Sequence, residues 1–308
     1  MAMIILHPNT YSNSCISGLK LWVFIVLPSS LPFFFLTTLF TQTGTLITLS
    51  QKLNKLSFTL FKQKGICFYA FLMSVLSGYP VGSRICYDLY TQGLINNHEA
   101  EKLSLLSSTS GPIFVIGAVG VTMFKSTLIG AILFLTHILS AIIVGVLVRN
   151  HGKTKALPNA LLYPQKVNNI LYDSVYQSVI SSLVVGGFIS IFYVIADIVK
   201  HTNLLYPIEF VFSKILLVFG ENPKLANSFL IGIIECTRGC RDLSTLPISP
   251  LIVALTGTLI SFGGISIIMQ SLAFLKGAKV KVLFFLKGKL LHALLTFILA
   301  FLFSFLFL

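Results

Sequence analysis

Long apolar runs constrain this chain more than any other feature of its sequence. A helix that crosses a bilayer needs about 20 mainly apolar residues, because each residue adds about 1.5 Å along the axis. Runs of about this length cover residues 19–40, 128–148, 174–199, 251–275 and 290–308. Since backbone amides in hydrocarbon must be bonded within their own segment, such runs fold as helices. We therefore predict an all-α, polytopic membrane protein.

The composition agrees with lipid as the main surroundings of the chain. Of its 308 residues, 55% are hydrophobic and 10% are charged, with a mean hydropathy of +0.91, whereas a soluble domain carries about 25% charged residues. Lys and Arg number 22 against 9 Asp and Glu, a net charge of +13. These cations fall between the apolar runs, where they hold loops on the cytoplasmic side and meet anionic headgroups. We expect the lipid bilayer, and no nucleic acid, as partner.

Three lysine-rich gaps set the predicted orientation, because basic loops stay cytoplasmic. Their basic residues are Lys52, Lys55, Lys62 and Lys64 in the first gap, Arg149, Lys153, Lys155 and Lys166 in the second, and Lys276, Lys279, Lys281, Lys287 and Lys289 in the third.

Gaps that share one side require an even number of crossings between them. Segments 103–124, which SSTSGP interrupts, and 128–148 already supply two crossings between the first and second gaps. The apolar segment 65–90 is therefore predicted to be a re-entrant helical hairpin. The same count after the second gap makes segment 225–242 a hairpin that enters from the other side.

The two halves then follow one order: helix, re-entrant hairpin, broken helix, helix. We predict a single transmembrane domain over residues 1–308, with a first repeat at 19–148, a cytoplasmic basic loop at 149–173 and a second repeat at 174–308. Three crossings per repeat make the second copy inverted. Inverted repeats with broken helices are typical of transporters, whose sites lie near the bilayer midplane.

The first hairpin carries the sequence LSGYPVGSRICYDLY at residues 76–90. Its glycines and proline end a helix there, and the next helix would direct its free amides and partial positive charge at a cavity. Arg84 stands four residues before Asp88, so it either forms an ion pair or contacts the solute. The candidate site residues here are Gly78, Tyr79, Pro80, Gly82 and Arg84.

The break SSTSGPIF at residues 107–114 predicts a second helix start. Pro112 suits a first helical turn, with Ser110 or Thr109 as the cap. Ser110 and Gly111 are the candidate site residues of this break.

Ionisable side chains cluster upstream of this break. The segment NNHEAEKL includes His98, Glu99, Glu101 and Lys102. It is interpreted as a solvated helix start rather than a metal site, because no second histidine lies at ligand spacing.

The second hairpin carries FLIGIIECTRGCRDLS at residues 229–244. An isolated Glu235 after LIGII must be paired, protonated or bound to a cation, and Arg238 either pairs with it or contacts the solute. Cys236 and Cys240 are either small buried residues or half of a soft-metal site. The candidate site residues are Glu235, Thr237, Arg238 and Gly239.

The last interruption is TGTLISFGGISIIMQ at residues 256–270, where Gln270 needs a polar partner in an apolar stretch. It adds Ser261, Gly263 and Gln270 to the candidate site. The pair Gly186 and Gly187 is interpreted as a helix-packing contact.

Motifs for nucleotide hydrolysis and proteolysis do not occur. The chain lacks GxxxxGK[ST], HExxH and GxSxG. We expect a protein that is not an enzyme and has no cofactor and no bound metal.

Four motifs in order carry a family resemblance: GYPVG (78–82), Glu99–Ala100 followed by SGPIF (110–114), ECTRG (235–239) and SFGGISIIMQ (261–270). Together they resemble the nucleoside-recognition, or Gate, superfamily, and within it the YlbJ-type sporulation integral membrane proteins. The resemblance covers residues 19–308 and implies a multi-pass protein of the bacterial cell membrane with a transporter-like fold, needed for spore or spore-cortex development.

These observations predict a permease for a small polar or anionic solute that binds where the hairpin tips meet the broken helices. The alternatives are a non-transporting membrane scaffold of sporulation and a metal or nucleoside permease. A second copy of the chain and other sporulation membrane proteins are the partners that the sequence leaves open.

Overall fold

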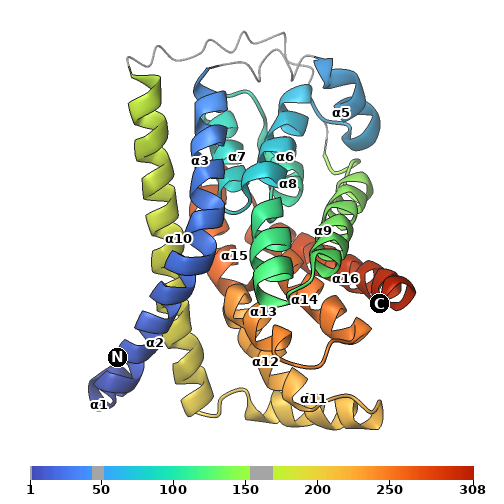
Figure 1. Cartoon of the computed structure of the whole chain (residues 1–308). Coiled ribbons are helices and arrows are strands. Elements are labelled where there is room, and N and C mark those ends of the chain that lie inside the picture. The colour runs from blue at the N-terminus through green and yellow to red at the C-terminus, as the bar shows by residue number, and fades with distance from the viewer. Residues whose placement is uncertain (1, 44–51, 153–168) are drawn as a thin grey trace.

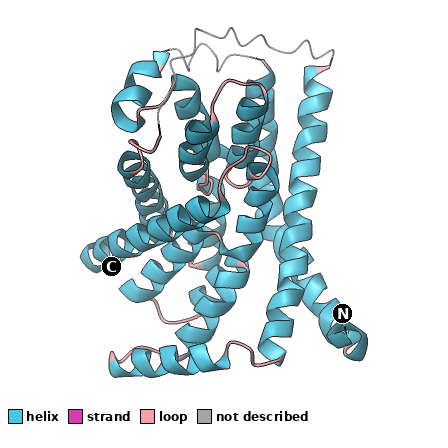
Figure 2. Ribbon diagram, turned by 180° about the vertical axis from the view of Figure 1, so that it is seen from behind, coloured by secondary structure: helices cyan, strands magenta, loops and turns pink. Residues whose placement is uncertain are grey.

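The computed structural model describes residues 2–43, 52–152 and 169–308, and within these ranges it forms helices and no strand (Figures 1 and 2). The elements are α1 (Ala2–Leu6), α2 (Pro8–Leu21), η1 (Trp22–Val26), α3 (Leu27–Gln42), α5 (Asn54–Phe61), α6 (Gly65–Ser77), α7 (Val81–Thr91), α8 (Asn97–Leu106), η2 (Ile113–Met123), α9 (Thr127–Leu147), α10 (Ile170–His201), α11 (Tyr206–Val218), α12 (Lys224–Ile234), α13 (Cys236–Ser244), α14 (Pro250–Phe262), α15 (Gly264–Leu275) and α16 (Val282–Phe307).

The five long apolar runs have counterparts in the structure, whereas the interrupted segment 103–124 supplies only the shorter apolar helix Ile113–Met123. Among the described residues, four stretches are long and apolar enough to cross a membrane: α9, α10, the α14–α15 pair and α16. The predicted span at 19–40 corresponds to a bent pair, Pro8–Val26 and Ser30–Leu36, with an angle of 59°. The prediction of an all-α fold with several membrane spans is confirmed.

The last span begins earlier than predicted. Helix α16 starts at Val282, so Lys287 and Lys289 belong to the helix and not to the basic gap. Lys289 is only 1% exposed. The prediction placed both lysines in a loop because charge was taken to end the span, but one buried lysine is tolerated when other polar groups surround it.

In both predicted hairpins, two helices pack against each other across a short break. In the first, α6 and α7 meet so closely that a Cβ at Gly82 would lie 2.7 Å from the Ser74 Cβ. In the second, a Cβ on Gly239 of α13 would lie 2.3 Å from the Gly232 Cα of α12. Their helix–break–helix form matches the prediction, whereas their entry from opposite faces of a bilayer stays a prediction.

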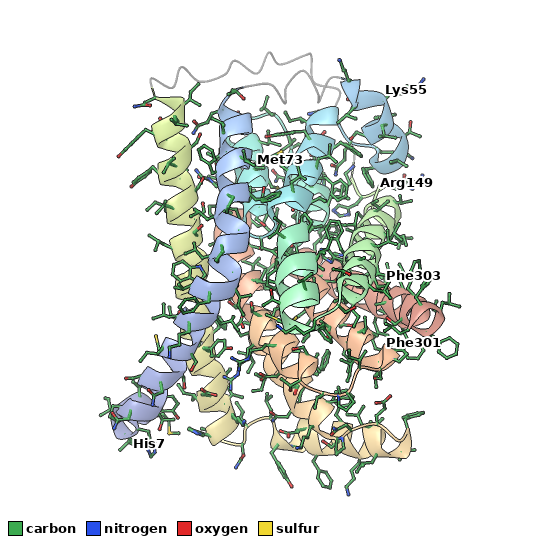
Figure 3. All side chains as sticks on the ribbon, viewed as in Figure 1. His7, Lys55, Met73, Arg149, Phe301 and Phe303 are labelled. Carbon is green, nitrogen blue, oxygen red and sulfur yellow. The ribbon has the colours of Figure 1, made fainter. Side chains whose placement is uncertain are left out.

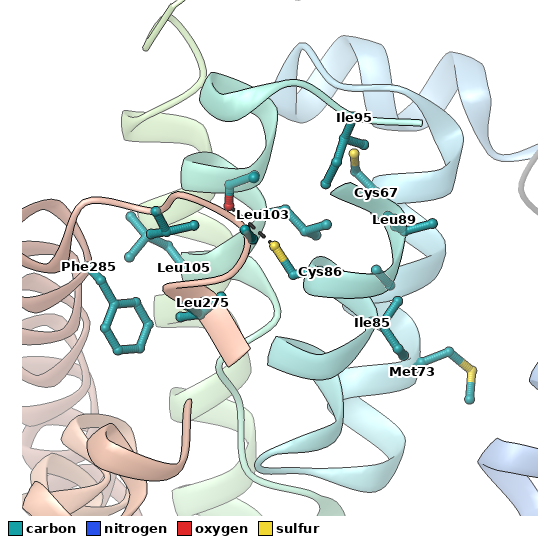
Figure 4. Packing of buried hydrophobic residues seen from close by; sticks show 14 of the residues in the cluster. Cys67, Met73, Ile85, Cys86, Leu89, Ile95, Leu103, Leu105, Leu275 and Phe285 are labelled. Carbon is teal, nitrogen blue, oxygen red and sulfur yellow. Dashed lines mark hydrogen bonds between the residues drawn. The ribbon is translucent and has the colours of Figure 1, made fainter. Parts of the chain in front are cut away.

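Each hairpin packs against a broken helix of the other half. One buried cluster joins α6, α7 and α8 to α15 and α16. Figure 4 shows its centre, where the Cys86 thiol donates to the Ala100 carbonyl, with Leu275 and Phe285 from the second half nearby. A second cluster joins α12, α13 and α14 to η2 and α9. This reciprocal packing fits two related halves, but the inverted repeat itself stays a prediction.

The three basic gaps meet at one end of the molecule. Lys62 donates to the Asn150 side chain at 2.7 Å, and Lys281 lies 3.9 Å from Glu101 of α8. Figure 3 shows Lys55 and Arg149 toward this end and His7 at the opposite end. Of the predicted loop 149–173, Lys153, Lys155 and Lys166 lie outside the described residues. The position of the three basic gaps at one end of the molecule agrees with the prediction. The cytoplasmic location of that end stays a prediction.

Candidate functional site

A small buried cavity lies where the two hairpin tips meet the two broken helices. Its volume is about 60 Å³, which is enough for a few water molecules. The η1–α3 segment and α10 close its side through Val26, Phe34 and Ile189. The predicted site residues that line it are Gly78, Tyr79, Ser110, Gly111, Glu235, Thr237 and Gln270.

The first hairpin tip fits directly against the first break. Gly78 has a φ of +79°, and a Cβ there would lie 2.7 Å from the Gly111 amide nitrogen. Only glycine combines that backbone conformation with so close an approach. Tyr79 then donates its hydroxyl to the Ser108 carbonyl at 2.8 Å. The tip is thus fixed by contacts with the SSTSGP break as well as by the bond from the Gly78 amide to the Ser74 carbonyl in its own hairpin.

Glu235 caps helix α13. Its carboxylate accepts hydrogen bonds from the amides of Thr237 at 3.2 Å and Arg238 at 2.6 Å, and the residue is 1% exposed. A carboxylate at this position satisfies free amides and meets the positive end of the helix dipole. The break after LIGII therefore supplies the partner that an isolated buried carboxylate requires.

The Arg238 side chain does not pair with Glu235. Its guanidinium donates a hydrogen bond to Asp197 of α10 at 2.7 Å and lies 3.8 Å from Asp242. The guanidinium carbon also lies 4.9 Å from the centroid of the Tyr193 ring. Pairing between Arg238 and Glu235 was one of the two sequence interpretations, and it is wrong. The Glu235 carboxylate turns toward backbone amides, so the guanidinium finds its charge partner on another helix.

Several other predicted site residues lie outside the cavity lining. Arg84 is 4.0 Å from Asp88 and donates to Gln177 at 2.7 Å, so the predicted ion pair exists at a half-exposed surface. Pro80 precedes α7, and Gly82 and Gly239 sit at the close contacts inside the hairpins.

The second break brings one polar side chain to the cavity and turns another away. Gly263 has a φ of +88° and ends α14. Gln270 lines the cavity and donates to Ser266 at 3.4 Å, which is the polar partner that it was expected to need. Ser261 faces a buried histidine instead.

That histidine belongs to a polar network that sequence reasoning missed. His137 of α9 accepts from the Ser110 amide at 2.9 Å through Nε2, and its Nδ1 lies 2.7 Å from the Ser261 hydroxyl. Ser261 also meets Thr296, and the His292 ring stacks on His137 with 4.8 Å between centroids. The network therefore joins the first break to the second. The sequence does carry a signal for this network, because a histidine inside an apolar span is by default a site candidate.

Lys289 was also missed, because it was assigned to a loop. Its ammonium donates to the Tyr79 hydroxyl at 2.6 Å and the Ser108 carbonyl at 3.2 Å, and lies 4.8 Å from the centre of the Tyr79 ring. No carboxylate in the described ranges forms an ion pair with it. A buried lysine therefore stands directly behind a side chain that lines the cavity.

Three other expectations need correction. Glu99, Glu101 and Lys102 are buried rather than solvated, since α8 packs between the basic gaps, although Asn96 and Glu99 do form a capping box at its start.

Neither Ser110 nor Thr109 caps η2 through a side chain, because the Thr109 hydroxyl bonds Ser74 and the Ser110 amide bonds His137.

The third concerns the glycine pair of α10. Gly186 packs on Trp22, whereas a Cβ on Gly187 would meet nothing within 4 Å.

The fold and this site define a class of protein: a polytopic α-helical membrane protein in which two helical hairpins and two broken helices surround a small cavity with a mainly apolar lining and a few polar groups. The chain is similar to the sporulation integral membrane protein YlbJ of Bacillus subtilis (strain 168), with 29% identity over 317 aligned positions that cover 94% of this chain and 77% of that protein. This similarity and the long apolar helices show that the chain is a multi-pass integral membrane protein.

Two other comparisons add no relative. The chain matches no protein-family model and no solved structure. Membership of the Gate superfamily stays a prediction.

Proposed function

We propose that this chain is a secondary-transporter-like permease, and not an enzyme, that moves a small polar or anionic solute through the cavity between the hairpin tips. One observation carries the proposal: residues of both tips, Tyr79 and Glu235, and of both broken helices, Ser110 and Gln270, line the same cavity. A packed structural core has no need of four backbone breaks around one cavity. Transporters bind solutes at such breaks.

The charges around the cavity favour an anionic group on its Tyr79 side. Lys289 lies behind the Tyr79 ring, and α7 begins beside the tip with no acidic residue in its first turn. The start of α13 is already occupied by the Glu235 carboxylate. An anion would thus find positive potential at the first tip and repulsion at the second.

An ion pair between two helices provides a gate on the side opposite the basic gaps. An open pocket of about 590 Å³ there is lined by Lys200 of α10 and Asp242 of α13. The same two helices contribute Ile189 and Thr237 to the cavity. The Arg238–Asp197 pair ties them between these points, so access to the cavity from the pocket requires this pair to separate.

The alternatives differ in support. A cavity of about 60 Å³ is too small for a nucleoside without rearrangement, and its size is the observation that favours a non-transporting scaffold. The geometry does not support a metal permease that binds its metal through the thiols. Cys236 and Cys240 lie 3.9 Å apart but are fully buried, outside the cavity lining, and Cys236 donates to the Leu259 carbonyl.

The biological setting follows from the relative. The Bacillus subtilis protein is named for sporulation, and we propose that this chain also acts in the membrane during sporulation, in agreement with the motif resemblance.

The decisive experiment compares the metabolites retained by membrane vesicles with and without the protein. A permease predicts a reproducible difference that Glu235→Gln and Arg238→Gln abolish at normal membrane abundance. Glu221→Gln, which lies outside the cavity lining, is the matched control and should behave as the wild type. Retention of the difference in both site variants, or no difference with the wild type, would support the scaffold.

A further inference from the structure

Three metal-binding side chains meet at the basic end of the molecule, away from the cavity. His98 and Glu101 lie three residues apart on α8, and His151 follows the end of α9. One ligand atom from each residue lies within 4.8 Å of the other two. The sequence has no second histidine at ligand spacing from His98, and the fold supplies that histidine from a distant position.

We propose that His98 Nδ1, Glu101 Oε2 and His151 Nε2 bind a divalent transition-metal ion, with Zn²⁺ as the best fit. Two imidazoles and one carboxylate are a common zinc donor set, and bonds of about 2.0–2.1 Å place tetrahedral ligands about 3.4 Å apart. The His98 Nδ1 to Glu101 Oε2 distance is already 3.5 Å.

The ligand atoms of His151 and Glu101 are joined by a hydrogen bond. His151 Nε2 lies 2.6 Å from Glu101 Oε2, so a proton occupies the place that a metal would take. Metal binding releases that proton to solvent, as is usual when a histidine becomes a ligand. The two atoms then separate by about 0.8 Å to reach tetrahedral spacing, a shift that side-chain rotation supplies.

The surroundings orient the ligands and leave a way in. The His151 ring stacks on Phe284 with 4.3 Å between centroids, and the backbone at Gly152 packs directly on His98. Glu101 is 2% exposed, whereas His98 is 51% and His151 33% exposed. Solvent can therefore deliver the ion and supply a fourth ligand.

One positive charge opposes the metal. Lys281 Nζ lies 3.9 Å from Glu101 Oε1, the oxygen that the proposed site does not use. Its side chain is 75% exposed, so it can move into solvent when the ion binds. The bound ion would fasten the loop after α9 to α8 and so hold the second basic gap to the helix that leads to the SSTSGP break. This proposal does not depend on solute transport.

Cobalt titration of the purified full-length chain in detergent tests the site, because four-coordinate Co²⁺ has intense visible absorption. The measurement uses the wild type and a Cys236→Ser/Cys240→Ser background, which removes the buried thiols as competitors. We expect one four-coordinate Co²⁺ per chain, displaced by Zn²⁺, in both. His98→Gln and His151→Gln should each weaken binding by about 100-fold or more, since even outer-shell changes cost about 10–100-fold.

The matched control is His201→Gln, whose histidine meets Tyr11 in α2 and should leave Co²⁺ binding unchanged. Zn²⁺ should also raise the melting temperature of the wild type but not of His98→Gln. His98 is half-exposed, so this variant should fold even if His151→Gln does not accumulate. Absence of the four-coordinate spectrum in the wild type, or wild-type affinity in His98→Gln, would overturn the proposal.

Discussion

Individual side chains at the cavity are held by partners that are distant in sequence. Glu235 closes the start of α13, Arg238 pairs with α10, and Lys289 reaches the first hairpin tip from the last helix. Each contact gives a polar group at membrane depth the partner without which it would cost several kcal/mol. Substitutions can therefore separate the groups that stabilise the fold from those that serve a solute.

Lys289→Met should leave the melting temperature unchanged or raise it, because a buried charge without a carboxylate partner is replaced by an apolar side chain of similar length. If the ammonium serves an anionic solute, the same change should abolish the difference in vesicle metabolites. Lys287→Met, at an exposed position of the same helix, should affect neither measurement. A large loss of stability in Lys289→Met would mean that the lysine has a structural role.

Tyr79→Phe should lower the free energy of unfolding by about 1.5–3 kcal/mol, the usual contribution of a hydrogen bond to a charged group. The change removes both the bond to the Ser108 carbonyl and an acceptor for the Lys289 ammonium. Thermal unfolding in detergent measures it, with the exposed Tyr176→Phe as the control. Equal melting temperatures for the two variants would contradict the assigned contacts.

At the scale of elements, close backbone approach decides how the helices pack. The bent α2–η1–α3 segment lies along α10, and Gly18 and Gly186 are the contact points, one on each side. The neighbouring Gly187 faces open space. Because Gly186 and Gly187 are neighbours in α10, substitutions at these two positions offer a matched test of this packing.

Gly186→Ala should destabilise the protein by about 1–3 kcal/mol, the typical cost of overpacking. The new Cβ would lie 2.4 Å from the Trp22 ring, and the ring must shift. Gly187→Ala should be neutral or slightly stabilising, since alanine is the better helix former. Melting temperatures of the two variants, measured side by side, test this packing. A similar decrease in melting temperature for both variants would show that α10 packs in another way.

The whole molecule has one basic end, formed by three loops that are far apart in sequence. All three gaps contact α8: Lys102 donates to the backbone carbonyls of Lys62 and Arg149, and Lys281 lies 3.9 Å from Glu101. Loops that share an end of a membrane protein share a compartment. The assignment of that compartment rests on the preference of Lys and Arg for the cytoplasmic side.

Cysteine labelling tests this orientation. In a Cys15→Ser background, Lys62→Cys and Lys279→Cys should resist a membrane-impermeant maleimide added to intact cells and react after permeabilisation. Lys62, Lys125 and Lys279 are all exposed, so reactivity reports the compartment. Lys125→Cys, between η2 and α9, is the comparison position and should differ from the other two. Labelling of Lys62→Cys and Lys279→Cys from outside would reverse the topology.

The sequence by itself determined the all-α membrane fold, the approximate positions of the spans, the shared end of the basic gaps and the positions of the four breaks. These follow from local properties: apolar length, charge in loops, and the backbone limits of glycine and proline. Only the tertiary structure decided that Arg238 meets Asp197 and not Glu235, that His151 reaches Glu101, that Lys289 is buried behind Tyr79, and that His137 joins the two breaks. Such pairings depend on how helices pack across the two halves, and spacing along one chain carries no information about which distant groups face each other.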